Sequence, residues 1–296
     1  RELMLSAHNL LSPAHGRPMV TPTKEMLIGA YYLTEPEDGA TGEGRSYRNL
    51  AQVERDLEAG VLEVHANITL RPGPDGSDRL ETTAGRVLFN TVLPEDFPYW
   101  NKSIRKGEMS DLVDRLVIFY PIATVAHSLD LLKELTLKWS TRSGLTMAIS
   151  DVRTPDSKKT ILDRFEDDTE KVERNFRRGV ITDGERIQKA VEIWSEATTE
   201  VTEAVADAMG NEKFNSLNMM VGSGARGNMM QVRQIAGMRG LVANPRGDMI
   251  PRPIKSNFRE GLDVLEYFIA TPGARKGLVD TALRTAHSGY LTRRLV

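Results

Sequence analysis

The 296-residue chain is 40% hydrophobic and 27% charged, and it carries a net charge of −2. This composition is normal for a soluble protein, and the length predicts about two domains. The absence of cysteine excludes disulfides and thiolate metal sites, and no apolar run reaches the roughly 18 residues that a membrane span needs.

Charge is distributed unevenly along the chain. From Arg226 to Val296 there are twelve Lys and Arg against five Asp and Glu, a net of +7, so the first 225 residues carry −9. Cations gathered at one end of an otherwise acidic chain indicate a surface that faces phosphates. The sequence starts without Met or a signal peptide and stops within a helical pattern, so we expect an internal piece of a longer protein.

The first 150 residues are predicted to mix helix and strand. Prolines keep the start extended, and KEMLIGAYYLT at 24–34 predicts a short helix capped by Thr21 or Thr23. His65 lies between apolar strand positions and is predicted to face solvent. The remaining expected elements are a helix at 46–60, a strand at 61–71, a turn at 71–78, a strand and short helix at 80–94, and helices at 101–138 with a break at Tyr120–Pro121.

Residues 157–209 have the clearest helical pattern. Gly179 is suited to end a first helix, and Thr182 with Glu185 forms a capping box for a second, so an antiparallel helical hairpin is predicted. The apolar stripes are narrow and the other positions are mostly charged, which favours a protruding hairpin over a helical pair within a bundle. The stripe positions are Ile161, Leu162, Phe165, Val172 and Phe176, then Ile187, Ala190, Val191, Trp194, Ala197, Val201 and Val205.

The basic end is predicted to contain two further helices. The first covers 257–271 with Asn257 as its N-cap, and Pro272 with Gly273 ends it. The second covers 274–296, and its two glycines, Gly277 and Gly289, each cost about 1 kcal/mol relative to Ala. We therefore expect this last helix to be bent or frayed when the chain is isolated.

Two segments carry candidate binding residues. SGARG is a glycine-rich turn whose Arg226 offers a rigid fork for phosphate, and Met220 lies just before it; the alternative is a plain surface loop. The last helix combines small residues with cations and suits stacked bases and a phosphate backbone; the alternative is a solvated basic helix. Its candidate residues are Arg275, Lys276, Thr285, Ala286, His287, Gly289, Tyr290 and Arg293. No two histidines have metal-ligand spacing.

Taken together, the segments resemble the largest catalytic subunit of bacterial DNA-dependent RNA polymerase, the β′ family. The matching stretches occur in the family's order and cover nearly the whole chain. They are LLSPAHGRP at 10–18, GAYYLT at 29–34, TRSG at 141–144, SGARGN at 223–228, QIAGMRGL at 234–241, NFREGLDVLEYF at 257–268, GARKGL at 273–278, DTALRTA at 280–286 and SGYLTRRLV at 288–296.

The resemblance implies a mixed α/β, predominantly helical piece in three parts. Residues 1–156 correspond to the pore region that follows the active-site barrel. Residues 157–245 correspond to the funnel, with the hairpin at 157–209 as rim of the secondary channel and a Gly-rich loop at 221–241. Residues 246–296 begin the cleft region and include the bridge helix at about 274–296.

The resemblance also implies roles and partners. Arg226 and Met220 would contact the incoming nucleotide, and the eight last-helix candidates would lie near template DNA. Partners would be DNA, RNA and nucleoside triphosphates, the β, α, ω and σ subunits, and regulators on the hairpin, in the cytoplasm at the nucleoid. Two residues depart from the family pattern: Pro272 replaces a usual His, and His287 replaces Asp or Asn.

The family's metal-binding motif, NADFDGD, is absent from these residues. The resemblance therefore implies Mg²⁺ with ligands outside this chain, no catalytic residue within it, and no nucleotidyltransferase activity of the piece alone. The main alternative is a stand-alone, non-enzymatic module that binds nucleic acid or a partner through the +7 segment. An independent phosphate-processing enzyme is disfavoured because no metal ligands or general base accompany SGARG.

Overall fold

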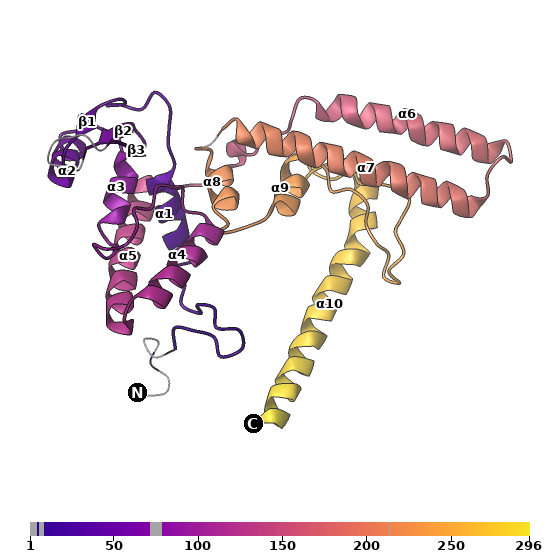
Figure 1. Cartoon of the computed structure of the whole chain (residues 1–296). Coiled ribbons are helices and arrows are strands. Elements are labelled where there is room, and N and C mark those ends of the chain that lie inside the picture. The colour runs from indigo at the N-terminus through magenta and orange to yellow at the C-terminus, as the bar shows by residue number, and fades with distance from the viewer. Residues whose placement is uncertain (1–4, 6–8, 72–78, 213) are drawn as a thin grey trace. The chain divides into compact units, whose positions relative to one another are not determined.

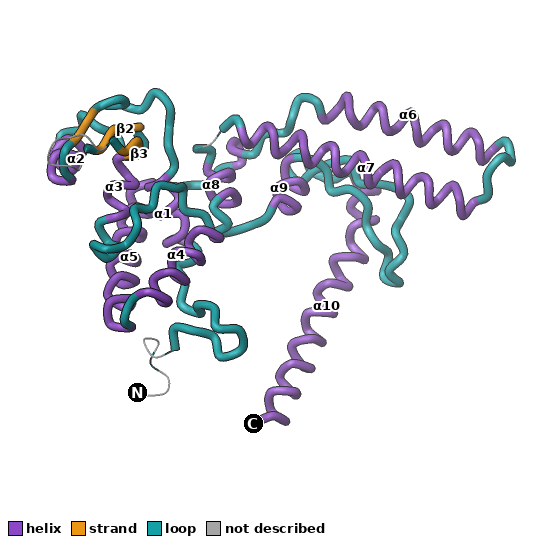
Figure 2. The backbone as a smooth tube through the Cα atoms, in the orientation of Figure 1, coloured by secondary structure: helices purple, strands orange, loops and turns teal. Residues whose placement is uncertain are grey.

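The computed structural model describes residues 5, 9–71, 79–212 and 214–296. The chain divides into two compact units, one of Arg1–Met147 with Phe214–Gly227 and one of Ala148–Lys213 with Asn228–Val296 (Figure 1). Helices dominate both units, and the strands form one small sheet, which confirms the predicted helical mixed α/β class (Figure 2). Among the described residues, no helix is both long enough and apolar enough to cross a membrane.

The first unit contains the sheet and most of the shorter helices. Its elements are α1 (Glu25–Thr34), β1 (Ser46–Tyr47), α2 (Leu50–Glu58), β2 (Asn67–Leu70), β3 (Leu80–Thr83), α3 (Ala84–Asn90), α4 (Lys106–Phe119), α5 (Ile122–Ser143) and α8 (Ser216–Gly222). Strand β2 is central; β1 pairs with it in parallel and β3 in antiparallel register, with Ile68 opposite Thr82. The break at Tyr120–Pro121 is confirmed between α4 and α5.

Helix α1 crosses its neighbours at unusually short range. A Cβ added at Gly29 would lie 1.9 Å from the carbonyl oxygen of Thr136 in α5, and one at Gly85 would lie 1.8 Å from that of Leu33. Glycine is therefore required at both crossings for steric reasons. The main core surrounds these crossings and includes Leu27, Leu33, Phe89, Ile104 and Leu112, each at most 1% exposed.

Four expectations for this unit need correction. Helix α1 has Lys24 at its N-cap position with φ 53°, and no side chain caps it, so neither Thr21 nor Thr23 does. The helix expected at 46–60 begins only at Leu50 because Ser46 and Tyr47 pair with β2. The strand expected at 61–71 is limited to Asn67–Leu70. The turn expected at 71–78 falls almost wholly outside the described residues.

His65 is the fourth correction, because it is buried rather than solvent-facing, at 6% exposure. Its ring lies edge-on to Tyr32 and Phe214, with centroids 4.5 and 4.7 Å away. Nδ1 lies 2.9 Å from the carbonyl oxygen of Glu35. Burial lowers the pKa of His65, against the opposing effect of this hydrogen bond and of nearby carboxylates.

The second unit is built on two long antiparallel helices, α6 (Lys158–Arg177) and α7 (Asp183–Gly210), which confirms the predicted hairpin. Gly179, with φ +73°, follows the end of α6, and Thr182 and Glu185 form the expected capping box. Arg164 of α6 pairs with Glu200 of α7. The buried seam consists of Ile161, Leu162, Phe165, Ala190, Trp194, Ala197, Val201 and Val205.

The unit continues through α9 (Met229–Ala236) to α10 (Val264–Leu295), and here the expected pair of helices is wrong. A single helix begins at Val264, with Asp263 as N-cap, and runs through Pro272. Proline lacks one backbone donor, but its φ is compatible with a helix. Asn257 is fully buried and caps only a single turn: its Oδ1 accepts from the N–H of Glu260 at 2.7 Å. Its Nδ2 donates to the carbonyl oxygen of Ala236 at 2.9 Å and to Thr154 Oγ1 at 3.2 Å.

Candidate nucleotide and nucleic-acid sites

The loop after α8 holds Arg226 by its backbone. The backbone N–H of Arg226 donates to the carbonyl oxygen of Met220 at 3.2 Å. Ser223 is fully buried; its hydroxyl donates to the same oxygen at 3.2 Å and accepts from the N–H of Ala225 at 3.2 Å. Gly224 has φ +76°, a conformation that favours glycine.

This loop is also tied to the start of α4. The N–H of Lys106 donates to the carbonyl oxygen of Ser223 at 3.0 Å, and a Cβ at Gly224 would lie 3.0 Å from Lys106 Cβ. The Arg226 side chain itself is exposed, and its guanidinium has no ion pair or hydrogen bond among the described residues. A fixed backbone with a free guanidinium is suited to binding a phosphate. Met220 is half-buried beside it.

The second candidate site is the C-terminal part of α10 together with Val296, that is, residues 274–296. From Ala274 to Val296 every residue is exposed except Asp280, which is half-buried. Successive residues of a helix are rotated by about 100°, and five of these positions lie within about 60° of one another around the helix. They form a stripe in which small residues lie between two arginines. These positions are Arg275, Ala282, Ala286, Gly289 and Arg293.

The other predicted residues flank this stripe. Tyr290 lies beside it, with the guanidinium of Arg294 over its ring at 5.5 Å. His287 is exposed on the same flank. Thr285 lies on the opposite flank, and its hydroxyl donates to the carbonyl oxygen of Thr281 at 2.9 Å. Lys276 differs from the other cations because its Nζ donates to the carbonyl oxygen of Pro245 at 2.9 Å.

The hydrogen bond of Lys276 joins α10 to a small β-hairpin at residues 242–250, which is called the supporting hairpin below. It contacts α10 close to Pro272. Asn244 Oδ1 accepts from the N–H groups of Arg246, Gly247 and Asp248 at 2.8, 2.9 and 3.1 Å, which closes this hairpin. A Cβ at Gly273 would lie 3.3 Å from Val242 Cγ1 of the same hairpin. The supporting hairpin therefore packs against α10 next to Pro272, the residue that lacks a backbone donor.

The stretch of α10 beyond this support is apolar on several sides as well as basic. Leu278, Leu283 and Leu295 are 76%, 57% and 78% exposed. A helix with exposed leucines around it is usually covered by something else in its working state. Arg226 and Met220 belong to the first unit and the α10 candidates to the second, so each unit contributes one set.

The described residues offer binding groups but no cation site. No three His, Cys, Asp or Glu side chains among them come together to hold a metal ion. The described residues therefore offer no site for Mg²⁺, whose ligands the family resemblance puts outside this chain, and no chemical step can be assigned through it here. The Arg226 loop has a side chain that can bind phosphate, and the exposed part of α10 can lie along nucleic acid.

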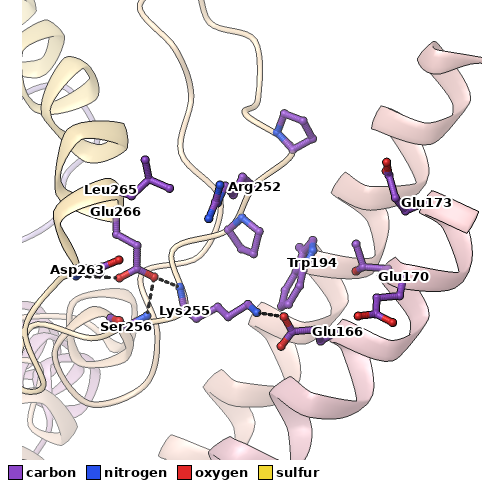
Figure 3. Close-up of a pocket in the computed structure, with 13 residues that line it drawn as sticks. Glu166, Glu170, Glu173, Trp194, Arg252, Lys255, Ser256, Asp263, Leu265 and Glu266 are labelled. Carbon is purple, nitrogen blue, oxygen red and sulfur yellow. Dashed lines mark hydrogen bonds and ion pairs between the residues drawn. The ribbon is translucent and has the colours of Figure 1, made fainter. Parts of the chain in front are cut away.

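A further polar site, which the sequence did not lead us to expect, lies at the start of α10. A cavity of about 550 Å³ is lined by the 251–256 segment, α6, Trp194 of α7 and the first turn of α10 (Figure 3). The carboxylate of Glu266 accepts hydrogen bonds from the backbone N–H groups of Lys255, Ser256 and Asp263, which all line this cavity. The local signal was Asp263 followed by Glu266 three residues later, a capping box immediately before an apolar run.

Comparison with known proteins identifies the chain. Three family models match consecutive segments: RNA polymerase Rpb1 domain 3 at residues 9–152, domain 4 at 181–259 and domain 5 at 261–296. The chain belongs to the family of RNA polymerase largest subunits. The expected resemblance is thereby confirmed.

Bacterial relatives named DNA-directed RNA polymerase subunit beta' match over 100% of the chain. Those of Beutenbergia cavernae, Acidothermus cellulolyticus and Cutibacterium acnes are each 52% identical, over 314, 315 and 307 residues. The chain spans 24% of the length of each of these relatives. It therefore corresponds to about a quarter of a β′-type subunit.

Proposed function

We propose that this chain is the part of a DNA-dependent RNA polymerase β′ subunit that lines the nucleotide entry channel and supplies the bridge helix. In this proposal residues 1–156 form the pore region, 157–245 the funnel with its rim hairpin, and 246–296 the start of the cleft with α10 as bridge helix. The complete enzyme would be a cytoplasmic, nucleoid-associated nucleotidyltransferase that makes RNA on a DNA template from nucleoside triphosphates.

One observation carries this proposal. The end of α10 is exposed on all sides and has a stripe of small residues bounded by Arg275 and Arg293. Small side chains allow close approach of a base pair, and arginines at both ends suit the template phosphates. Within this arrangement Thr285, Ala286, Gly289 and Tyr290 would lie nearest the template, with Lys276 and His287 beside them.

The chain's proposed role is to position substrates. Arg226, held by its backbone beside Met220, would bind the phosphates of the incoming nucleotide. The Mg²⁺ ions of the complete enzyme supply charge stabilisation for phosphoryl transfer, and their ligands would lie outside this chain. The chain alone is therefore expected to be inactive, and to work with the other polymerase subunits and with regulators that dock on the α6–α7 hairpin.

The test uses complete polymerase that contains this chain. Arg226→Ala should raise the KM for nucleoside triphosphates on the order of 10- to 100-fold, because a charge-assisted phosphate contact contributes about 1.5–3 kcal/mol. The matched control is Arg246→Ala, which removes an exposed arginine from another glycine-containing turn. An unchanged KM in Arg226→Ala would contradict the nucleotide role.

The stripe on α10 has its own pair of variants. Arg293→Ala should slow elongation at saturating nucleotide, whereas Arg284→Ala should not, since Arg284 lies on the opposite face of the same helix. Equal elongation rates for the two variants and the wild type would contradict the template role of α10.

A further inference from the structure

Among the residues that the structure describes, contacts that support α10 lie only near its beginning. Ala270 is its one buried residue, and the supporting hairpin contacts it at Gly273 and Lys276. The last 20 residues extend roughly 30 Å beyond this support at about 1.5 Å per residue. A tilt of about 5° at the base would therefore move the far end by about 3 Å.

The first turn of α10 is attached through the carboxylate of Glu266. Glu266 Oε1 accepts from the backbone N–H of Lys255 at 2.9 Å and of Ser256 at 3.3 Å, and Oε2 accepts from that of Asp263 at 3.2 Å (Figure 3). Glu266 therefore completes the capping box of α10 and joins the helix to a segment eleven residues earlier. Burial acts to raise the pKa of Glu266, but the Ser256 side chain together with these backbone hydrogen bonds outweighs it and lowers the pKa, so the ionised form is favoured.

The segment held by Glu266 is itself fixed to the rest of the unit. Ile254 is fully buried and exchanges backbone hydrogen bonds with Gly240 at 2.9 and 3.0 Å. The Nζ of Lys255 lies 2.6 Å from Glu166 of α6 and 5.4 Å from the ring centroid of Trp194 in α7. The carboxylate of Glu266 thus attaches α10 to a segment that is fixed against the α6–α7 hairpin at Glu166 and Trp194.

We propose that Glu266 is a positioning residue, which aims the Arg275–Arg293 stripe by fixing the direction of α10 against the 255–256 segment. This inference rests on the function proposed above for α10. Glu266 touches neither nucleotide nor template in this proposal. Its loss should therefore change how fast the enzyme works more than how tightly it binds nucleotide.

The experiment compares Glu266→Ala and Glu266→Gln in complete polymerase. Glu266→Ala should lower kcat on the order of 10- to 100-fold, because misplacement by about 1 Å far from the chemistry has effects of this size. The KM for nucleotides should stay within about twofold, since uniform binding is untouched. Glu266→Gln keeps a carbonyl oxygen that accepts the N–H groups of Lys255 and Ser256, and it should restore most of the rate.

Glu170→Ala is the matched control. Glu170 lines the same cavity, but its carboxylate has no partner among the described residues, so its removal should leave kcat and KM at wild-type values. Equal kcat in Glu266→Ala and Glu170→Ala would overturn the proposal. So would a kcat loss that Glu266→Gln fails to relieve, or one accompanied by faster hydrogen exchange throughout α6 and α7, which indicates general destabilisation.

Arg293→Ala in the same assay separates this inference from the function on which it rests. If Arg293→Ala is impaired and Glu266→Ala is not, only the positioning role fails. If neither Arg293→Ala nor Glu266→Ala is impaired, the proposed role of α10 fails with it.

Discussion

The α6–α7 hairpin and α10 are the longest helical parts of the same unit, yet they are supported in opposite ways. Helix α7 has 28 residues and buries five, from Ala190 to Val205, and α6 packs against it. Helix α10 has 32 residues and buries only Ala270. The two helices of the hairpin pack against each other, whereas most of α10 has no packing partner within the described part of the chain.

This difference shows that helical pattern and helical stability are separate properties. Isolated helices are marginal in water, and most helical stability in proteins comes from packing of one face. Helix α10 also contains Pro272, Gly277 and Gly289, which all lower its intrinsic stability. We therefore expect the hairpin to remain folded in the isolated chain and the end of α10 to depend on contacts from outside it.

The largest expected effect is on the hairpin seam. Trp194→Ala should lower the free energy of unfolding of the second unit by about 3–5 kcal/mol, because it removes a large side chain that is 2% exposed. The measurement is urea denaturation of the whole chain, with hydrogen exchange of α7 as the local readout. Leu283→Ala on exposed α10 is the control and should change stability by no more than about 0.5 kcal/mol. An equal loss of unfolding free energy in Trp194→Ala and Leu283→Ala would contradict the difference in packing between the hairpin and α10.

The next effect is on α10 itself. Pro272→Ala restores a backbone N–H for the carbonyl of Phe268, and an interior proline costs about 3 kcal/mol relative to Ala. Hydrogen exchange at 277–296 should therefore slow in the isolated chain. Exchange in α7 serves as the internal reference and should not change. If exchange at 277–296 is already as slow as in α7 before the substitution, α10 does not need outside contacts.

The smallest effect concerns the hairpin turn. Thr182 Oγ1 accepts from the N–H of Glu185 at 3.3 Å, and the carboxylate of Glu185 accepts from the N–H of Thr182 at 2.8 Å. Thr182→Ala should lower the free energy of unfolding by about 1 kcal/mol, a typical capping value. Thr199→Ala is a matched control, because the hydroxyl of Thr199 bonds only a carbonyl within its own helix.

The same cap gives a pH dependence with a definite sign. The N–H and hydroxyl of Thr182 lower the pKa of Glu185 below its ordinary value of 4.5. The part of the box that the Glu185 carboxylate makes is therefore complete above that pH and is lost as the pH falls through the lowered pKa. The stability difference between wild type and Thr182→Ala should shrink on acidification; a constant difference would mean that Glu185 takes no part.

Local signals predicted the hairpin but not the start of α10. Gly179, Thr182 and Glu185 act through residues a few positions away, so the sequence pattern contained the whole argument. Asn257 has the right type for an N-cap, and its Oδ1 does accept from the N–H of Glu260, but the turn ends at Gly261, where φ is +89°. Its Nδ2 is bonded to Thr154 and Ala236, which are distant in sequence, and no short-range pattern reveals those contacts.

The same reason explains the other errors and the missed residue. His65 follows the alternation of an exposed strand position, but Phe214, distant along the chain, covers it. For Arg226 the glycines of its own turn are only a weak signal, the nucleotide role is implied by the family resemblance, and that role stays a prediction. Glu266 escapes sequence analysis because Asn257 fits the start of a helix, which puts Asp263 and Glu266 inside the predicted helix at 257–271 and not at its beginning.

The two crossings of α1 have a consequence for the tolerance of this chain to mutation. At Gly29 and Gly85 even a methyl group would overlap a carbonyl oxygen. A larger residue at either position would require two backbones to separate together. Replacing either glycine therefore changes the spacing between two elements of the fold, and not only one side chain.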